Sequence, residues 1–272
     1  MRQGRVLIVA GSDSGGGAGI QADIKTVTAL QGYAATAVTA LTAQNTLGVE
    51  GIHGVPEAFI REQMRVVLDD IGADAVKTGM LHSTAVVECV CETLDAYAPD
   101  VPLVADPVMV AQSGDRLLVE EAVEAIRDRL LPRAALITPN VPEAQVLTGR
   151  EIREVADMDA AAESLLALGA GAVLLKGGHL AGEDVTDVLA TAQGLRHFVN
   201  PRVNTRNDHG TGCTLASAIA TGIGQGLSLE QAVARGRAYL QRALETARPL
   251  GAGHGPVNHA HTVHTFTVSG VH

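Results

Sequence analysis

Short runs of β-branched and aliphatic residues alternate with amphipathic stretches along nearly the whole of this 272-residue chain. The first run, residues 6–10, reads Val-Leu-Ile-Val-Ala and is apolar at every position. Strands that are apolar on both faces are typical of parallel sheets covered by helices on both sides. The alternation therefore predicts an α/β fold with a mostly parallel sheet.

The breaks between these stretches show where the elements begin and end. The expected strands are 5–10, 34–40, 50–55, 75–78, 102–105, 135–137 and 172–175, with a hairpin of 184–190 and 195–203 about Gln193-Gly194. The expected helices are 20–31, 56–71, 83–97, 120–130, a short one after Pro142, 157–168, 213–224 and 229–248. Glycine-rich breaks at 11–19, 177–178 and 210–212 fall at strand ends, where open α/β sheets bind ligands. We expect one domain over residues 1–258, and a C-terminal extension over 259–272.

The overall charge and composition exclude several classes of protein. Thirty Asp and Glu against 20 Lys and Arg give a net charge of −10, and no basic block is present. With only 3 Phe, 3 Tyr and no Trp, stacking platforms for bases are also scarce, so we expect no nucleic-acid partner. The apolar runs are far shorter than the ~20 residues of a membrane span, and no leader is recognisable. Three cysteines make no disulfide framework, so a cytoplasmic protein is expected.

The first glycine-rich loop, Gly-Ser-Asp-Ser-Gly-Gly-Gly-Ala-Gly from residue 11, invites a nucleotide-binding interpretation. It lacks the Gly-Lys-Ser/Thr of a P-loop. It fits Gly-x-Gly-x-x-Ala through Gly17, Gly19 and Ala22, but the second strand ends in Leu-Thr-Ala-Gln-Asn, without the acid that a dinucleotide ribose requires. A loop whose backbone can approach a small ligand is the better interpretation, with Asp13 and Asp23 nearby.

A second glycine-rich turn, Asn-Asp-His-Gly-Thr-Gly-Cys at 207–213, opens into an apolar helix. Free N–H groups and the helix dipole at such an N-terminus form an anion hole suited to a phosphoryl group. A thiol at this place, here Cys213, typically has a lowered pKa. Cys213 could be a hydrolase nucleophile with His209, a residue beside a reacting phosphate, or inert filling, and we favour the second role.

Polar residues follow several of the predicted strands. Asp106 ends one strand, and Asn140 and Glu143 follow another, where two carboxylates could hold Mg²⁺ together with phosphate oxygens. Each acid taken alone could equally cap a helix or be solvated. Lys176, also at a strand end, could meet a nucleotide phosphate.

The last stretch of the chain carries three histidines, His259, His261 and His264. Their spacing could ligate a metal. A solvated terminal segment is the favoured interpretation, because chain ends are commonly loose.

Five motifs together resemble the hydroxymethylpyrimidine/phosphomethylpyrimidine kinases of thiamine biosynthesis, which belong to the ribokinase-like superfamily. These motifs are the loop from Gly11 to Lys25, Thr-Ala-Gln-Asn at 42–45, Lys-Thr-Gly-Met at 77–80, Asp-Pro-Val-Met at 106–109 and His-Gly-Thr-Gly-Cys at 209–213. The resemblance implies a three-layer α/β/α sandwich, a homodimer, and ATP and Mg²⁺ as co-substrate and cofactor. It also implies phosphorylation of 4-amino-5-hydroxymethyl-2-methylpyrimidine to the monophosphate and then to the diphosphate.

The same resemblance implies roles for individual residues. Gln44 would recognise the aminopyrimidine edge, with Asp23, Gly11, Met80 and Val108 lining the substrate pocket. ATP would be held by Asn140, Lys176 and Thr211, and Mg²⁺ by Asp106 and Glu143. The catalytic group would be Cys213 with the amides of Gly210 and Gly212, where Cys213 takes the place of the aspartate base of sugar kinases. Two alternatives stay open, namely a pyridoxal or pyridoxine kinase of the same superfamily and a non-catalytic protein that binds a vitamin precursor.

Overall fold

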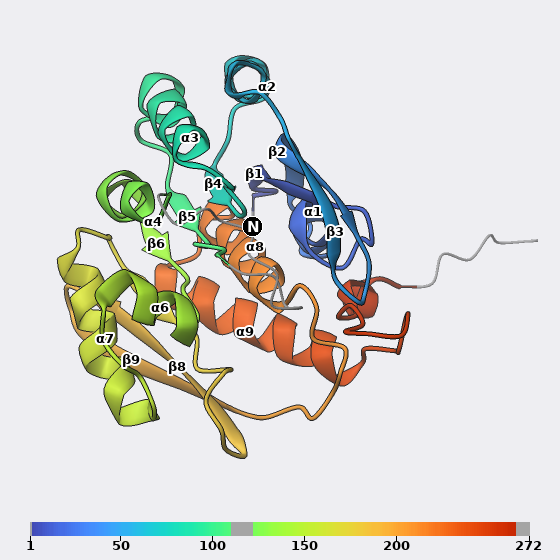
Figure 1. The fold of residues 1–272 in the computed structure, drawn as a ribbon, viewed down its shortest axis with the longest axis vertical. Helices are drawn as coiled ribbons and strands as arrows, with labels where there is room; N and C mark the ends of the chain where they lie inside the picture. The colour runs from blue at the N-terminus through green and yellow to red at the C-terminus, as the bar shows by residue number, and fades with distance from the viewer. Residues whose placement is uncertain (1, 110–121, 265–272) are drawn as a thin grey trace, which may run out of the picture.

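The computed structural model describes residues 2–109 and 122–264. Within them the strands form a single sheet in the order β3-β2-β1-β4-β5-β6-β7-β8-β9 (Figure 1). The strands are β1 (Arg5–Asp13), β2 (Tyr33–Gln44), β3 (Val49–Gly54), β4 (Ala75–Thr78), β5 (Leu103–Ala105), β6 (Leu136–Ile137), β7 (Val173–Leu175), β8 (Asp184–Thr191) and β9 (Gly194–Pro201).

The middle of the sheet is parallel, and its two margins are antiparallel. Strands β2, β1, β4, β5, β6 and β7 pair in parallel, whereas β3 at one margin and the β8–β9 hairpin at the other run antiparallel to their neighbours. The central strand β1 is buried from Val6 to Ala10, as its run of apolar residues requires. Since β2 and β4 lie on opposite sides of β1, the chain reverses its direction of travel across the sheet at β1.

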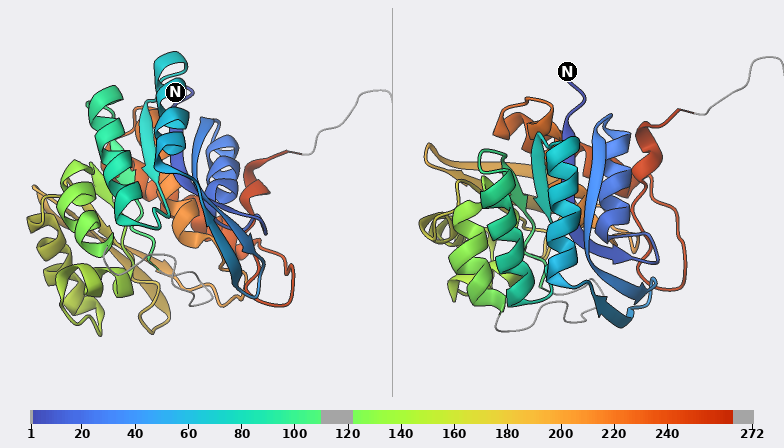
Figure 2. Two further views of the ribbon diagram at one scale, coloured as in Figure 1. Left: turned by 45° about the horizontal axis from the view of Figure 1, so that its top comes forward. Right: turned by 90° about the horizontal axis from the view of Figure 1, so that it is seen from above.

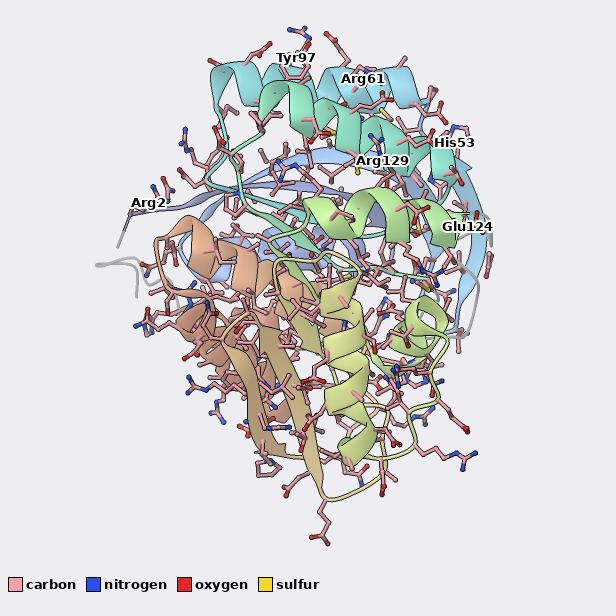
Figure 3. The ribbon with its side chains drawn as sticks, turned by 90° about the vertical axis from the view of Figure 1, so that its left-hand side faces the viewer. Arg2, His53, Arg61, Tyr97, Glu124 and Arg129 are labelled. Carbon is pink, nitrogen blue, oxygen red and sulfur yellow. The ribbon has the colours of Figure 1, made fainter. Side chains whose placement is uncertain are left out.

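Helices cover both faces of the sheet, which confirms the predicted three-layer arrangement (Figure 2). One face carries α2 (Glu57–Asp70), α3 (Thr84–Tyr97), α4 (Ala122–Ala125) with the π-turn Ile126–Leu130 and α5 (Leu131–Arg133), α6 (Val141–Thr148) and α7 (Val155–Ala167). The other face carries α1 (Gly19–Ala29), α8 (Thr211–Gly224) and α9 (Leu229–Glu245). Each helical layer encloses an apolar core against the sheet, and Arg61 and Tyr97 lie on the outer side of the first layer (Figure 3).

Local signals in the sequence explain where several helices begin. The Ser83 side chain accepts a hydrogen bond from the Val86 N–H at the start of α3, and Pro56 precedes α2. At α6, Asn140 and Glu143 form a reciprocal capping box. These caps fix the points at which the loops leave the sheet, so they also determine where the side chains of those loops lie.

The predicted elements occur with shifts of a few residues at their ends, and the hairpin about Gln193-Gly194 is confirmed. One difference matters for the site, because β1 continues to Asp13 where the sequence predicted a loop from residue 11. Past a bulge, Ser12 and Asp13 still pair with β2, so Asp13 sits on a strand. The start of the predicted helix 120–130 lies outside the described residues. No helix in the described part of the chain is long and apolar enough to cross a membrane.

Candidate active site

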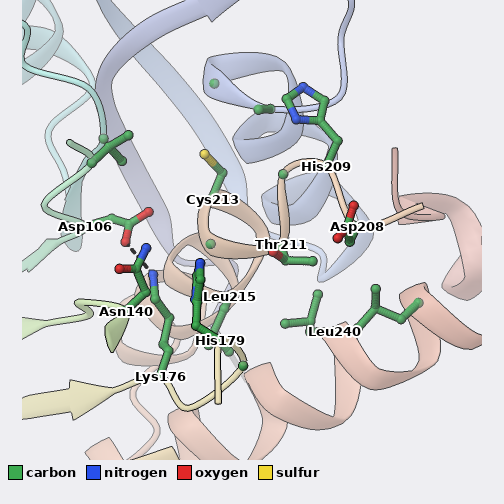
Figure 4. Close-up of a pocket in the computed structure, with 18 of the residues that line it drawn as sticks. Asp106, Asn140, Lys176, His179, Asp208, His209, Thr211, Cys213, Leu215 and Leu240 are labelled. Atoms are coloured by element: carbon green, nitrogen blue, oxygen red, sulfur yellow. Dashed lines mark hydrogen bonds and ion pairs between the residues drawn. The ribbon is translucent and has the colours of Figure 1, made fainter. Parts of the chain in front are cut away.

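A cavity of about 530 Å³ opens at the carboxyl ends of the parallel strands (Figure 4). Its floor comprises Gly11 from β1, and Gly79, Asp106, Asn140 and Lys176, which follow β4, β5, β6 and β7. This is the edge of an open α/β sheet where ligands bind, beside the strand at which the chain reverses direction.

The structure brings almost all of the predicted site residues to this one cavity. Those that line it are Gly11, Gln44, Met80, Asp106, Val108, Asn140, Glu143, Lys176, Gly210, Thr211, Gly212 and Cys213. Asp23 is not among them. The predicted constellation is therefore a spatial cluster, although its members span some two hundred residues of sequence.

Helix α8 points its N-terminus into the cavity. Gly210 precedes its first turn with φ of 83°, and a Cβ there would lie within bonding range of the Gly17 carbonyl oxygen, so only glycine fits. The first N–H groups of a helix have no carbonyl partner within it and carry partial positive charge. A Cβ on Gly212 would lie 3.3 Å from both Asp106 Oδ2 and Lys176 Nζ, which places this N-terminus directly beside an ion pair.

That ion pair joins Lys176 and Asp106. The Lys176 ammonium lies 2.9 Å from Asp106 Oδ1, and the Thr138 hydroxyl donates to the same oxygen. Burial would raise the pKa of Asp106, but Lys176 and Lys77 outweigh it and hold the pKa below its ordinary value. Lys176 keeps 14% of its side chain exposed, toward the cavity. A charged lysine thus faces the space next to the α8 amides.

Glu143 supplies a second carboxylate to the same region. Its Oε2 accepts the Asn140 N–H at 2.8 Å, which is the capping-box contact that fixes the side chain. Burial raises the pKa of Glu143 to about 7, and Asp106 acts in the same direction while Lys176 opposes it. A buried carboxylate with a raised pKa lacks sufficient positive charge around it. The site therefore has a donor set and a charge deficit that fit a divalent cation held by one or two carboxylates.

The prediction of a lowered thiol pKa at Cys213 is wrong. Burial raises the pKa of Cys213 to about 11, and although Lys77 opposes this shift, Asp23 and Asp106 add to it. Neither Lys77 nor a backbone hydrogen bond from Gly19 compensates for the loss of solvent and the two nearby carboxylates. Cys213 is therefore a neutral thiol at neutral pH, which is unsuited to the hydrolase nucleophile considered from the sequence.

The structure places Asp23 behind the cavity. Both of its oxygens lie 2.9 Å from Lys77 Nζ, the Ser217 hydroxyl donates to Oδ1 at 2.6 Å, and neither charged side chain has any exposed surface. Burial alone would lower the pKa of Lys77, but its contacts with Asp23 outweigh burial and raise it. Sequence reasoning assigned no role to Lys77, since a lysine within an apolar strand does not reveal its partner.

Asp13 organises the first glycine-rich loop, a role that sequence reasoning also missed. Its carboxylate accepts hydrogen bonds from the N–H groups of Gly15, Gly17 and Ala18, and lies 2.9 Å from His209 Nε2. Burial would raise the pKa of Asp13, but these hydrogen bonds hold it below its ordinary value. A Cβ on Gly17 would collide with the His209 ring. Two of the glycines, 17 and 210, thus allow the two glycine-rich turns to pack together.

One side of the cavity comes from residues that the sequence analysis did not single out, although most of the elements that carry them were predicted. His179 follows β7, and residues 203–205 lead from the β8–β9 hairpin toward α8. Leu215 of α8 and Leu240 of α9 add apolar surface there (Figure 4). Leu244 of α9 also lines the cavity. An apolar wall beside an anion-binding helix end is suited to the base and ribose of a nucleotide.

The C-terminal histidines do not form a metal site. Among residues 2–109 and 122–264, no three His, Cys, Asp or Glu side chains are grouped so that they could hold a metal ion. The favoured prediction of a solvated segment is wrong for His259, which is buried against α8, and holds for the exposed His264. Cys89 and Cys91 are buried on α3, as expected of small apolar residues.

Comparisons with known proteins agree with this geometry. A protein from Geobacter sulfurreducens named thiamine biosynthesis bifunctional protein ThiED is 53% identical over 94% of this chain, which spans about half (52%) of that protein. A Streptomyces coelicolor protein named hydroxymethylpyrimidine/phosphomethylpyrimidine kinase is 49% identical, with 93% of each chain covered. The crystal structure of an ADP complex of Bacillus subtilis pyridoxal kinase superimposes with a TM-score of 0.88 at 34% identity, covering 95% of this chain and 98% of that one.

These likenesses confirm the predicted ribokinase-like fold, and the curated relatives are more similar in sequence than the pyridoxal kinase. The phosphomethylpyrimidine kinase family matches residues 13–258, a range that contains every residue of the cavity except Ala10, Gly11 and Ser12. The chain therefore belongs to the phosphomethylpyrimidine kinase family.

Proposed function

We propose that this protein transfers the γ-phosphoryl group of ATP to 4-amino-5-hydroxymethyl-2-methylpyrimidine, and then phosphorylates the monophosphate to the diphosphate, in thiamine biosynthesis. One observation carries the proposal, namely that the N-terminus of α8 opens between two chemically different halves of one cavity. Lys176, Asp106 and Glu143 form the charged half, which suits the triphosphate of a nucleotide such as ATP. Gly11, Gln44 and Met80 form a compact half, which suits a small ring with polar edges.

Phosphoryl transfer requires positioning and charge stabilisation more than covalent chemistry by the protein. The first amides of α8 and the Lys176 ammonium stabilise negative charge on the transferred group, while Asn140 and Thr211 help to place the nucleotide. As the hydroxymethyl oxygen bonds to the γ-phosphorus, the bond to the ADP oxygen breaks and the hydroxyl proton is released. Cys213 lies at the boundary between the two halves, where its sulfur orients this hydroxyl and, as thiolate, accepts the proton.

Mg²⁺ would be held by Glu143 and Asp106 together with phosphate oxygens. Two observations support a cation here: both carboxylates line the cavity beside the N-terminus of α8, and burial raises the pKa of Glu143, a shift that a nearby cation would offset. When bound, the ion supplies positive charge that neutralises the triphosphate. We expect turnover to vanish with EDTA and to return with excess Mg²⁺.

The role of Cys213 can be tested through pH, because the pKa of this thiol is raised to about 11. Below that value the thiolate fraction increases tenfold for each pH unit, so kcat should increase between pH 7 and pH 9. Cys213→Ala should lower kcat by about 10²–10⁴-fold and abolish the slope, whereas Cys213→Asp should recover part of the rate with a flat profile. A Cys213→Ala enzyme of full activity, or a trapped phosphocysteine, would contradict the mechanism.

The proposed activity is tested by coupled ADP release with three acceptors, namely the hydroxymethylpyrimidine, its monophosphate and pyridoxal. We expect turnover with both pyrimidines. The structural likeness to a pyridoxal kinase at 34% identity favours pyridoxal as the second candidate acceptor. The amide of Gln44, whose Oε1 lies 3.1 Å from the Thr42 hydroxyl, can both donate to and accept from an aminopyrimidine edge, and so favours the pyrimidine.

We further propose that the protein is a cytoplasmic homodimer. Leu41 of β2, Leu47 in the turn that follows it and Ile52 of β3 are exposed at the antiparallel margin of the sheet, and Phe59 is exposed on α2, the next helix in the chain. Exposed apolar side chains at and near a sheet margin suit a second copy of the same chain. Light scattering should give twice the chain mass of 28.1 kDa, and Ile52→Lys should shift the mass toward the monomer.

A further inference from the structure

The chain beyond α9 returns across the molecule and passes behind the catalytic turn. The Gly255 carbonyl accepts the His209 N–H at 3.0 Å, and the His254 N–H donates to the Thr46 carbonyl at 2.8 Å. Thr46 follows Gln44 by two residues, and His209 precedes the N-cap of α8. This C-terminal segment, residues 251–262, thus contacts the loops that carry both halves of the active site.

His259 in this segment makes the contact nearest to the catalytic group. Its Nε2 lies 3.0 Å from the Thr214 hydroxyl, and its carbonyl accepts the Tyr239 hydroxyl at 2.8 Å. Thr214 is the residue after Cys213, and its own N–H makes the first hydrogen bond of α8, to the Gly210 carbonyl. The side chain of His259 is therefore attached to the first turn of the helix whose amides face the cavity.

The His259 ring cannot act there as a cation at neutral pH. Burial, assisted by the positive charges of Lys25 and His261, lowers the pKa of His259 to about 4. The contact with Thr214 is therefore a hydrogen bond between two neutral buried groups. Its loss would leave a buried hydroxyl or ring nitrogen without a partner, which destabilises the local arrangement rather than changing its charge.

We propose that His259 is a positioning residue for phosphoryl transfer, which holds the first turn of α8, and with it Cys213, through the Thr214 hydroxyl. The proposal rests on the proposed function for its effect on rate. It also assigns a role to a residue just beyond 13–258, the range matched by the family.

Matched variants separate this role from simple packing. The amide of Gln reaches about as far from the backbone as Nε2 of His, whereas the amide of Asn reaches only as far as Nδ1. His259→Gln should therefore keep at least half of kcat, and His259→Asn should lower it about tenfold. Thr214→Ser, which keeps the hydroxyl, should resemble the parent enzyme, and Thr214→Val should resemble His259→Asn. KM for ATP should change less than twofold in all four variants.

The double variant His259→Asn/Thr214→Val completes the test. If one hydrogen bond carries the effect, its kcat should equal that of either single variant. Two independent tenfold losses that multiply would overturn the proposal, as would an unchanged kcat in Thr214→Val.

A second measurement does not depend on any substrate. The rate at which iodoacetamide alkylates Cys213, followed by peptide mass spectrometry, should be slow in the parent protein and at least fivefold faster in His259→Asn and Thr214→Val. The Gln and Ser variants should match the parent. Cys89 and Cys91 are buried elsewhere, so a parallel acceleration at all three cysteines would indicate general loosening and overturn the proposal. If the alkylation pattern is as expected but the parent protein phosphorylates neither pyrimidine, the proposed function fails and the positioning role stands.

Discussion

Two buried lysine–carboxylate pairs lie near Cys213, and they differ in their surroundings. Lys77 and Asp23 have no exposed surface, and Ser217 supplies a further hydrogen bond. Lys176 and Asp106 form an equally short pair, but Lys176 is 14% exposed and both residues line the cavity. The same two residue types thus form one closed pair beneath the site and one open pair within it.

The difference shows how surroundings decide what an ion pair can do. A closed pair has no access to a ligand, so its removal should affect folding first. An open pair can exchange part of its contacts for the phosphates of a nucleotide, so its removal should affect turnover first. The resemblance in sequence implied that Asp23 lines the pocket, but the structure assigns it to the closed pair.

Of the variants considered, the one that breaks the closed pair should have the largest effect, and this effect should be on the stability of the fold. Lys77→Met leaves Asp23 buried without a counter-ion, and we expect the free energy of unfolding in urea to decrease by about 3–5 kcal/mol. The double variant Lys77→Met/Asp23→Leu should recover most of this loss, because it removes the unpaired charge. A single variant as stable as the parent would show that the pair is not the closed structural element described above.

Breaking the open pair should produce the opposite division between stability and rate. Lys176→Met should lower kcat by about 10²–10³-fold, since one charged donor to the transferred phosphoryl group is lost. Water from the cavity can solvate Asp106, so the free energy of unfolding should change by less than about 2 kcal/mol. Steady-state kinetics and urea unfolding on the same preparation measure both quantities. A stability loss as large as that of Lys77→Met would erase the distinction.

Glu143, beside the open pair, allows the comparison to be sharpened through pH. Its pKa is raised to about 7 in the folded protein, from an ordinary value of 4.5. Between these values the folded protein binds the proton more tightly than the unfolded chain, so this residue makes stability decrease as pH rises. Without metal, Glu143→Gln should gain about 1–3 kcal/mol relative to the parent between pH 5 and pH 8. A stability difference that does not vary with pH would contradict the raised pKa.

Gln44 belongs to neither pair, and its substitution should have the smallest effect, confined to the binding of the pyrimidine. Gln44→Ala removes the amide proposed to pair with the pyrimidine edge, and about 1–3 kcal/mol of binding should be lost. The loss should appear as a higher KM for the pyrimidine, with KM for ATP and the urea midpoint unchanged. An unchanged KM for the pyrimidine would exclude Gln44 from its recognition.

Sequence patterns predicted the order of the elements and most members of the site, but not the pairing of its charges. Asp106, Asn140 and Lys176 were found because each follows a recognisable strand, and strands in a parallel sheet end at one edge. Lys77 was missed because it lies inside such a strand, where only the fold shows that Asp23, 54 residues away, is its partner. The role of the buried His259 was missed because a histidine-rich chain end suggests solvent or metal, and only the fold shows that Thr214 is its partner.

The sequence by itself determined the α/β alternation, the glycine-rich turns and the family, because periodicity, turn chemistry and motifs depend on residues that are neighbours in the chain. The tertiary structure alone decided which lysine forms the closed pair and which forms the open pair. It also decided that the Cys213 thiol is neutral, with a pKa raised to about 11 rather than lowered. The physical reason is that burial and the approach of distant charges set a pKa, and both arise only when segments far apart in sequence pack together.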